Sequence, residues 1–195
     1  RSLAGYQAVT SGRVKRADGL QLAYLPQQPG SVFFCETVTE EIAWTLNRRG
    51  SNFSVSEVLE EFGLESKALS HPRDLSGGER ERAAMAAVLV GDPQLILLDE
   101  PTRGMDVWRK AELVQILRRR QASGALVVLA THDVDLVAAL ATRVVVLGDG
   151  DVIADGSPRA VLAGSLSRST QINRLLGSTW LTVDDVIADQ ERRRR

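Results

Sequence analysis

Apolar residues in the second half of the chain fall into short continuous runs and into longer segments with helical spacing. The aliphatic runs at 95–98 and 126–130 are typical of buried strands. The alanine-rich segment 77–90 and the segments 106–121 and 133–141 predict helices. Because these strands and helices alternate, the pattern favours an α/β core built on a mostly parallel sheet.

A different pattern follows this alternation. Two short apolar runs, 144–147 and 152–154, flank the sequence Gly148-Asp149-Gly150. Glycine and aspartate are typical of the tight turns that join antiparallel strands, so we expect a hairpin here.

The first thirty residues predict short β structure and loops. Residues 12–14 and 20–25 are expected to form two short strands separated by a turn at 17–19. The segment 26–30, with its prolines and glycine, predicts a loop. Residues 1–5 resemble the last turn of a helix ended by glycine, so we expect residue 1 to be an internal cut in a longer chain.

Two capping boxes predict a compact helical insert over residues 36–72. In each box, a hydroxyl side chain precedes a glutamate by three residues, as in Thr37–Glu40 and Ser54–Glu57. The hydroxyl accepts from a free amide of the first turn, and the glutamate reaches back to the cap. We therefore expect helices over 38–47 and 55–62.

Composition narrows the class of protein. Hydrophobic residues make up 44% of the 195 residues, charged residues make up 25%, and the net charge is -1. This is an ordinary globular profile that gives no support to broad nucleic-acid binding. No apolar run approaches the length that spans a membrane. Cys35 is the only cysteine, which fits a reducing compartment. The arginines at 192–195 are expected to form a solvated tail.

A pair of carboxylates is the first candidate for chemistry. Asp99 and Glu100 directly follow a buried run, at the end of a strand where open α/β sheets gather their catalytic groups. Consecutive strand residues point to opposite faces, so Asp99 could face a metal ion while Glu100 points at a water. One carboxylate is enough for magnesium, which keeps most of its waters. Two solvated acids at a turn are the alternative.

Three further candidates lie in loops or at helix starts. Ser76-Gly77-Gly78 opens a helix whose free amides and positive dipole end favour an anion, although a plain serine-capped helix is the alternative. His132 follows the second buried run and could donate to a phosphate oxygen, or be structural. Gln27 in its loop is a weak candidate by itself.

The order of these motifs along the chain carries a resemblance. A loop glutamine, Leu-Ser-Gly-Gly-Glu, a strand ending in Asp-Glu and Ala-Thr-His-Asp occur in sequence. Over nearly the whole chain this resembles the nucleotide-binding domain of ABC ATPases. The matching positions are Gln27 of the Q-loop, 75–79 of the signature motif, Asp99 of Walker B, the catalytic Glu100, Asp106 of the D-loop and the switch His132.

The resemblance implies ATP and Mg²⁺ as cofactors and a P-loop NTPase-like core with a small helical subdomain. Glu100 and His132 would be catalytic, and Asp99 with Gln27 would hold the metal. The residues that would contact the nucleotide are Gln27, Ser76, Gly77, Gly78, Glu79 and Asp106.

The sequence departs from the family pattern in two places. Position 79 is glutamate where the family more often has glutamine. The phosphate-binding loop G-x-x-x-x-G-K-S/T, Walker A, does not occur in these 195 residues, so we expect them to be inactive alone.

Further cues resemble the energy-coupling-factor importers, which take up vitamins or metal ions. They are Leu25-Pro26-Gln27-Gln28-Pro29, the segments 37–41 and 133–136, and the extension 170–177. The implied partners are a second ABC ATPase domain, as homodimer, heterodimer or tandem fusion, and a transmembrane subunit, at the cytoplasmic face of the cell membrane. No nucleic-acid partner is expected. A soluble ABC ATPase of translation or DNA repair, or a degenerate module that only donates its signature, remains an alternative.

The resemblance also divides the chain into four expected parts. They are residues 1–35 (remainder of the N-terminal core and β-subdomain), 36–72 (helical subdomain), 73–165 (C-terminal part of the core) and 166–195 (C-terminal extension).

Overall fold

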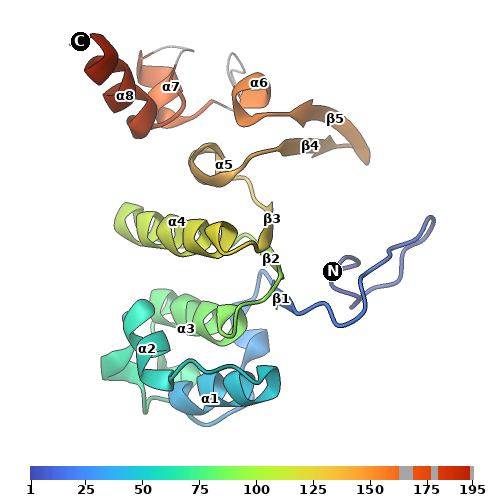
Figure 1. The fold of residues 1–195 in the computed structure, drawn as a ribbon, viewed down its shortest axis with the longest axis vertical. Helices are drawn as coiled ribbons and strands as arrows, with labels where there is room; N and C mark the ends of the chain where they lie inside the picture. Colours follow the sequence, from blue (N-terminus) through green and yellow to red (C-terminus); the bar gives the residue numbers. More distant parts are fainter. Residues whose placement is uncertain (163–168, 177–179, 194–195) are drawn as a thin grey trace. The chain divides into compact units, whose positions relative to one another are not determined.

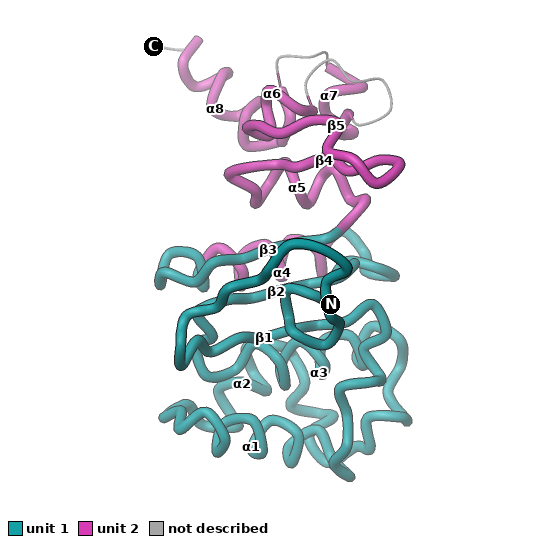
Figure 2. Tube along the Cα trace, turned by 90° about the vertical axis from the view of Figure 1, so that its right-hand side faces the viewer, with its two compact units in different colours: residues 1–107, 119–130 teal, residues 108–118, 131–195 magenta. Residues whose placement is uncertain are grey.

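The computed structural model describes residues 1–162, 169–176 and 180–193 (Figure 1). The chain divides into two compact units, residues 1–107 with 119–130 and residues 108–118 with 131–195 (Figure 2). Gly177 of the expected extension and Arg194 and Arg195 of the expected tail lie outside the described residues.

A three-stranded parallel sheet forms the centre of the first unit. Its strands are β1 (Leu22–Leu25), β2 (Leu95–Asp99) and β3 (Leu126–Ala130), in the order β1-β2-β3. All three strands run the same way, as the alternation of runs and helices predicts. In the central strand β2, Ile96 is fully buried. The carboxyl ends of the three strands therefore lie at one edge of the sheet.

β3 forms at the expected residues, but the prediction that it is buried was wrong. Its side chains alternate between half-buried and exposed, and Leu126 and Val128 keep 62% and 37% of their surface. β3 is an edge strand, and the described residues leave one of its faces partly open. The aliphatic run therefore predicts a strand correctly here but does not predict that the strand is buried.

Residues 12–14 are described and form no strand, contrary to the prediction. The turn expected after them, at 17–19, is present. Val14 stands among charged residues and pairs with no strand of the described chain, whereas the Leu20 amide closes the turn onto the Ala17 carbonyl at 3.3 Å. Residues 1–6 have the geometry of a helix end. Gly5 has φ +85°. The Gly5 amide donates to the Ser2 carbonyl, and the Tyr6 amide donates to the Arg1 carbonyl.

Three complete helices belong to the first unit and lie on one side of its sheet (Figure 1): α1 (Val38–Arg49), α2 (Val55–Glu61) and α3 (Gly77–Leu89). Both predicted capping boxes form, at the starts of α1 and α2. α3 is buried along its alanines, whose small side chains let it pack closely against β1 and α1. Short 3-10 turns connect these elements at Pro29–Val32 (η1), Glu65–Lys67 (η2) and Pro72–Asp74 (η3).

An ion-pair cluster joins the helical insert to the rest of this unit. Arg120, near the end of α4 (Val107–Ala122), lies 2.9 Å from Glu61 of α2 and 3.1 Å from Asp92. Its side chain is 14% exposed, so water screens these contacts only in part. The neighbouring Arg119 also reaches Glu61, at 3.2 Å, but is 63% exposed.

The second unit contains residues 108–118 of α4 and all elements after β3. Asp133 starts α5 by accepting from the Leu136 amide at 3.1 Å, and Lys110 pairs with the same carboxylate. The expected hairpin is present, with Asp149 and Gly150 both at positive φ (51° and 90°), as a two-residue turn of this kind requires. The elements are α5 (Val134–Leu140), β4 (Val144–Gly148), β5 (Asp151–Gly156), α6 (Pro158–Leu162), α7 (Gln171–Leu176) and α8 (Val183–Arg193). None of the described helices has the length and apolarity needed to cross a membrane.

Candidate functional site

The two candidate carboxylates lie at the carboxyl end of the central strand. Asp99 is the last residue of β2 and is half-buried opposite Ala130 of β3. The Glu100 amide donates to the Ala130 carbonyl at 2.8 Å, and Glu100 itself has φ +52°. A left-handed backbone costs a residue with a side chain roughly 1–2 kcal/mol. Such strain clusters at functional sites, where the surrounding structure enforces it.

This geometry corrects the expectation that strand alternation separates the two side chains. β2 ends at Asp99, so the direction of Glu100 is set by a turn. The turn is closed by the Arg103 amide on the Glu100 carbonyl at 3.3 Å, and Thr102 within it is 5% exposed. Asp106 follows as an exposed residue directly before α4.

The start of α3 is a complete capping box. The Ser76 hydroxyl accepts from the Glu79 amide, and the Glu79 carboxylate accepts from the Ser76 amide at 2.9 Å. Lys67 lies 3.3 Å from the same carboxylate. The hydrogen bonds from Ser76, with help from Lys67, lower the pKa of Glu79 to about 2. The serine-capped helix that the sequence offered as an alternative is therefore present.

Capping does not close the helix start to a ligand. A β-carbon built on Gly77 would meet no atom within 4 Å, and one on Gly78 would meet only the Arg82 guanidinium, at 3.8 Å. Both glycines are exposed in the first turn of a 13-residue helix, where amides and the dipole favour an anion. Two of the three residues in this motif thus present open backbone to solvent.

The remaining candidates are exposed. Gln27 stands two residues after the end of β1. Because β1 and β2 are parallel and in register, the Gln27 loop starts at the same sheet edge as Asp99. His132 belongs to the second unit, just before the capping residue of α5. The structure of the first unit therefore brings together the glutamine loop and the two carboxylates.

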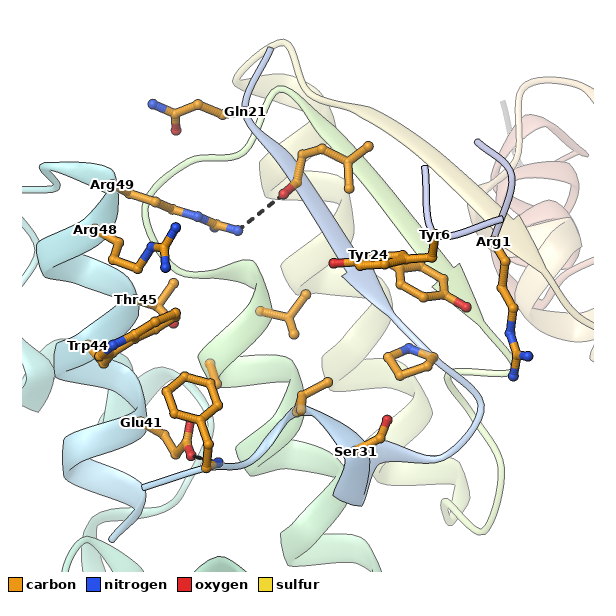
Figure 3. Close-up of a pocket in the computed structure, with 16 residues that line it drawn as sticks. Arg1, Tyr6, Gln21, Tyr24, Ser31, Glu41, Trp44, Thr45, Arg48 and Arg49 are labelled. Atoms are coloured by element: carbon orange, nitrogen blue, oxygen red, sulfur yellow. Dashed lines mark hydrogen bonds between the residues drawn. The ribbon is translucent and has the colours of Figure 1, made fainter. Parts of the chain in front are cut away.

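A cavity of about 880 Å³ lies beside the Gln27 loop, between α1 and β1 (Figure 3). Trp44 and Arg48 of α1 form one wall, with the guanidinium 4.7 Å from the indole ring, and Phe34 packs edge-on against Trp44 at 4.4 Å. Tyr6 and Tyr24 lie together on the other side of the cavity from Trp44, with their ring centroids 5.5 Å apart (Figure 3). The four-residue spacing of Trp44 and Arg48 in the predicted helix over 38–47 and its end is the sequence signal for this pairing.

Two buried acids were also missed. Glu41 of α1 is 2% exposed and Glu81 of α3 is 8% exposed. Burial raises the pKa of Glu81 to about 7, although the positive charge of Arg103 opposes the rise.

Within the described ranges, no group of three or more histidine, cysteine, aspartate or glutamate side chains could hold a metal ion. Such a group would suit zinc or calcium. Asp99 by itself suits magnesium, which takes one or two protein carboxylates and retains its waters.

Comparison with known proteins decides the family. The profile of the ABC transporter family matches residues 2–103, more than half of the chain. The chain belongs to the ABC transporter family. ABC ATPases hydrolyse ATP, and the α/β fold with its parallel sheet is the one the sequence predicts for this family.

Relatives and solved structures agree with this assignment. An ABC transporter ATP-binding protein of Streptomyces avermitilis is 42% identical over 168 residues, covering 85% of this chain and 30% of its own length. The energy-coupling factor transporter ATP-binding protein EcfA of Methanocaldococcus jannaschii is 34% identical over 142 residues, covering 70% of this chain and 51% of its own. The chain spans about a third of the first curated relatives it matches, 30% and 35% of their lengths.

Two solved structures resemble the fold. A metal-chelate type ABC transporter in an inward-facing conformation superposes with a TM-score of 0.65 at 21% identity, over 83% of this chain and 67% of the other. CbiO1 of Clostridium perfringens, part of the ABC transporter complex CbiONQ, superposes with a TM-score of 0.58 at 28% identity, over 72% and 59%.

Proposed function

We propose that this chain is the ATP-hydrolysing component of an ABC importer that drives transport through a membrane partner. The observation that carries the proposal is the strained Glu100 beside Asp99 at the carboxyl end of the central strand. A carboxylate held in the left-handed region by a closed turn is pre-positioned, and preorganised charge is the main source of catalysis in phosphoryl transfer.

The residues divide the work of hydrolysis. Glu100 orients and polarises the attacking water. Asp99 and Gln27 would hold the metal ion. His132 donates to the transferred phosphate, and Asp106 acts in the loop that follows. In this arrangement the protein positions groups and stabilises charge, and does little covalent chemistry.

The residues present fit part of a Mg-ATP site. Asp99 suits the metal, and the open amides at Gly77 and Gly78 suit phosphate oxygens. When bound, the metal neutralises charge that develops on the phosphate. A G-x-x-x-x-G-K-S/T loop is not among these 195 residues, so the pocket around a nucleotide would need other groups as well.

The open start of α3 supports a role toward a second ATPase domain. In a head-to-tail dimer, Ser76, Gly77 and Gly78 would face a nucleotide bound by the partner domain, with Glu79 fixing the cap. The partner is a second ABC ATPase domain, either a separate copy or a tandem half. No nucleic-acid partner is proposed.

The cavity beside the Gln27 loop supports a role toward a membrane subunit. Its exposed aromatic and arginine side chains are of the kind enriched at interface hot spots. We place the protein peripherally, at the cytoplasmic face of the membrane. The EcfA relative and the CbiO1 structure favour an energy-coupling-factor importer of vitamins or metal ions.

Glu100→Gln in the full-length protein tests the proposal. The amide keeps the shape and hydrogen bonding but removes the base and its charge, and general-base contributions run to about 10²–10⁴-fold. Steady-state ATP turnover should therefore fall by about a hundredfold or more, while nucleotide binding persists. Turnover within about threefold of the unmodified protein would refute the role of Glu100.

A further inference from the structure

Two adjacent glutamates in the first turn of α1 hold four consecutive backbone amides. One carboxylate oxygen of Glu41 accepts from the amides of both Phe34 and Cys35. One carboxylate oxygen of Glu40 accepts from the next two amides, at 3.1 and 3.0 Å. The chain that enters α1 is therefore fixed to the helix over residues 34–37.

The two glutamates have different roles. Glu40 is exposed and belongs to the capping box, which the sequence predicts. Glu41 is 2% exposed, and burial of a carboxylate is unfavourable unless donors compensate it. Charge-assisted hydrogen bonds from backbone amides are such compensation, and they are stronger than bonds between neutral groups. Glu41 is thus bound to the 34–35 backbone at a buried position.

Residues 34–35 are the far end of the loop that carries Gln27. The near end of this loop is fixed by β1, which pairs with β2 up to Leu25. We propose that Glu41 is a positioning residue for the Gln27 loop, and that its buried carboxylate makes the loop move together with α1. This inference rests on the proposed role of Gln27 at the nucleotide.

The contacts continue from α1 to the start of α3. The amides of Val38 and Thr39 donate to the carbonyls of Ser70 and Ala68 at 3.2 and 3.0 Å. In the same segment, Lys67 pairs with Glu79 of the α3 capping box. A contiguous set of hydrogen bonds and one ion pair therefore connects the Gln27 loop to the helix that presents Gly77 and Gly78.

Cys35 supplies a local reporter of this contact. Burial raises the pKa of its thiol, and the negative charge of Glu41 raises it further. Neutralising Glu41 removes part of that effect, so more thiolate forms at a given pH and alkylation becomes faster. This response tests whether the charge of Glu41 lies beside the 34–35 backbone, and the exchange and kcat measurements test its positioning role.

The experiment compares Glu41→Gln with the exposed control Glu60→Gln in the full-length protein. Without nucleotide, amide exchange in the peptide 26–37 should rise about tenfold in the Glu41 variant, equivalent to about 1.4 kcal/mol. The alkylation profile of Cys35 should move to lower pH. The kcat for ATP hydrolysis should fall about fivefold or more with KM within about twofold. The control should match the unmodified protein in all three measurements.

Unchanged exchange and an unchanged Cys35 profile would overturn the inference. Gln27→Ala separates it from the proposed function. If Gln27→Ala leaves hydrolysis intact while Glu41→Gln loosens the loop, the role of Gln27 fails and the contact stands. If Gln27→Ala lowers hydrolysis but Glu41→Gln alters neither exchange nor kcat, the positioning role fails. Should Glu41→Gln not fold, Glu41→Asp keeps the charge but shortens the reach, and intermediate exchange is expected.

Discussion

Replacing Glu81 with glutamine should stabilise the protein at pH 8 and leave its stability at pH 4.5 nearly unchanged. Burial in α3 raises the pKa of this carboxyl from 4.5 to about 7. Below pH 4.5 the group is protonated in both the folded and the unfolded chain. Between pH 4.5 and 7 the unfolded chain releases this proton and the folded chain retains it. The free energy of unfolding therefore falls as the pH rises through this window.

The size of the effect follows from the difference between the two pKa values. About 2.5 pH units correspond to about 3.4 kcal/mol at 1.36 kcal/mol per unit. Solvent that reaches the carboxyl reduces the penalty, and we expect about 2 kcal/mol above pH 7. Glutamine is neutral at every pH, so the variant does not carry this penalty.

Urea denaturation followed by circular dichroism at pH 4.5, 6, 7 and 8 measures the effect. The stability difference between Glu81→Gln and the unmodified protein should grow from near zero to about 2 kcal/mol. Glu60→Gln, on the exposed face of α2, should stay within about 0.5 kcal/mol throughout. A Glu81→Gln difference that is constant across this range would show that Glu81 titrates normally, and would refute the argument from burial.

Two other predictions concern the insert and the start of α3. Arg120→Met should lower the free energy of unfolding, measured with urea, by about 2 kcal/mol, because it breaks partly buried pairs to Glu61 and Asp92. Arg119 is exposed, so Arg119→Met should cost less than about 1 kcal/mol, and equal losses would contradict the difference in burial. Gly78→Asp should abolish ATP-dependent dimerisation measured by light scattering, since its carboxylate would occupy the open helix start and repel the partner's nucleotide phosphate. Unchanged dimerisation would exclude a role of this motif in trans.

The sequence predicts elements best where local chemistry decides the structure. The capping boxes of α1 and α2 form as expected because their hydrogen bonds join residues three apart. Val14 and Leu126 show the opposite case. Strand pairing at 12–14 and burial at 126 depend on partners distant in sequence, and an apolar pattern does not specify those partners.

The sequence predicts the positions of the candidate residues in the fold better than their backbone geometry. Asp99 ends its strand as the aliphatic run indicates. The positive φ of Glu100 has no local signature, because the turn around it enforces a conformation that glutamate disfavours. Glu41 and Glu81 read as solvated helix residues, since burial of an acid depends on the tertiary surroundings that enclose it.

Under the proposed role of Glu100, the left-handed backbone at position 100 sets folding and chemistry in opposition. Glycine adopts this conformation without the clash that a side chain meets there, so it would relieve roughly 1 kcal/mol of strain. Any selection for expression, solubility or thermal tolerance alone would therefore tend to accept glycine at this residue and discard the carboxylate. Stability-guided engineering of this protein should hold position 100 fixed, because a stability assay would not detect the loss of turnover that the proposed role of Glu100 predicts for glycine.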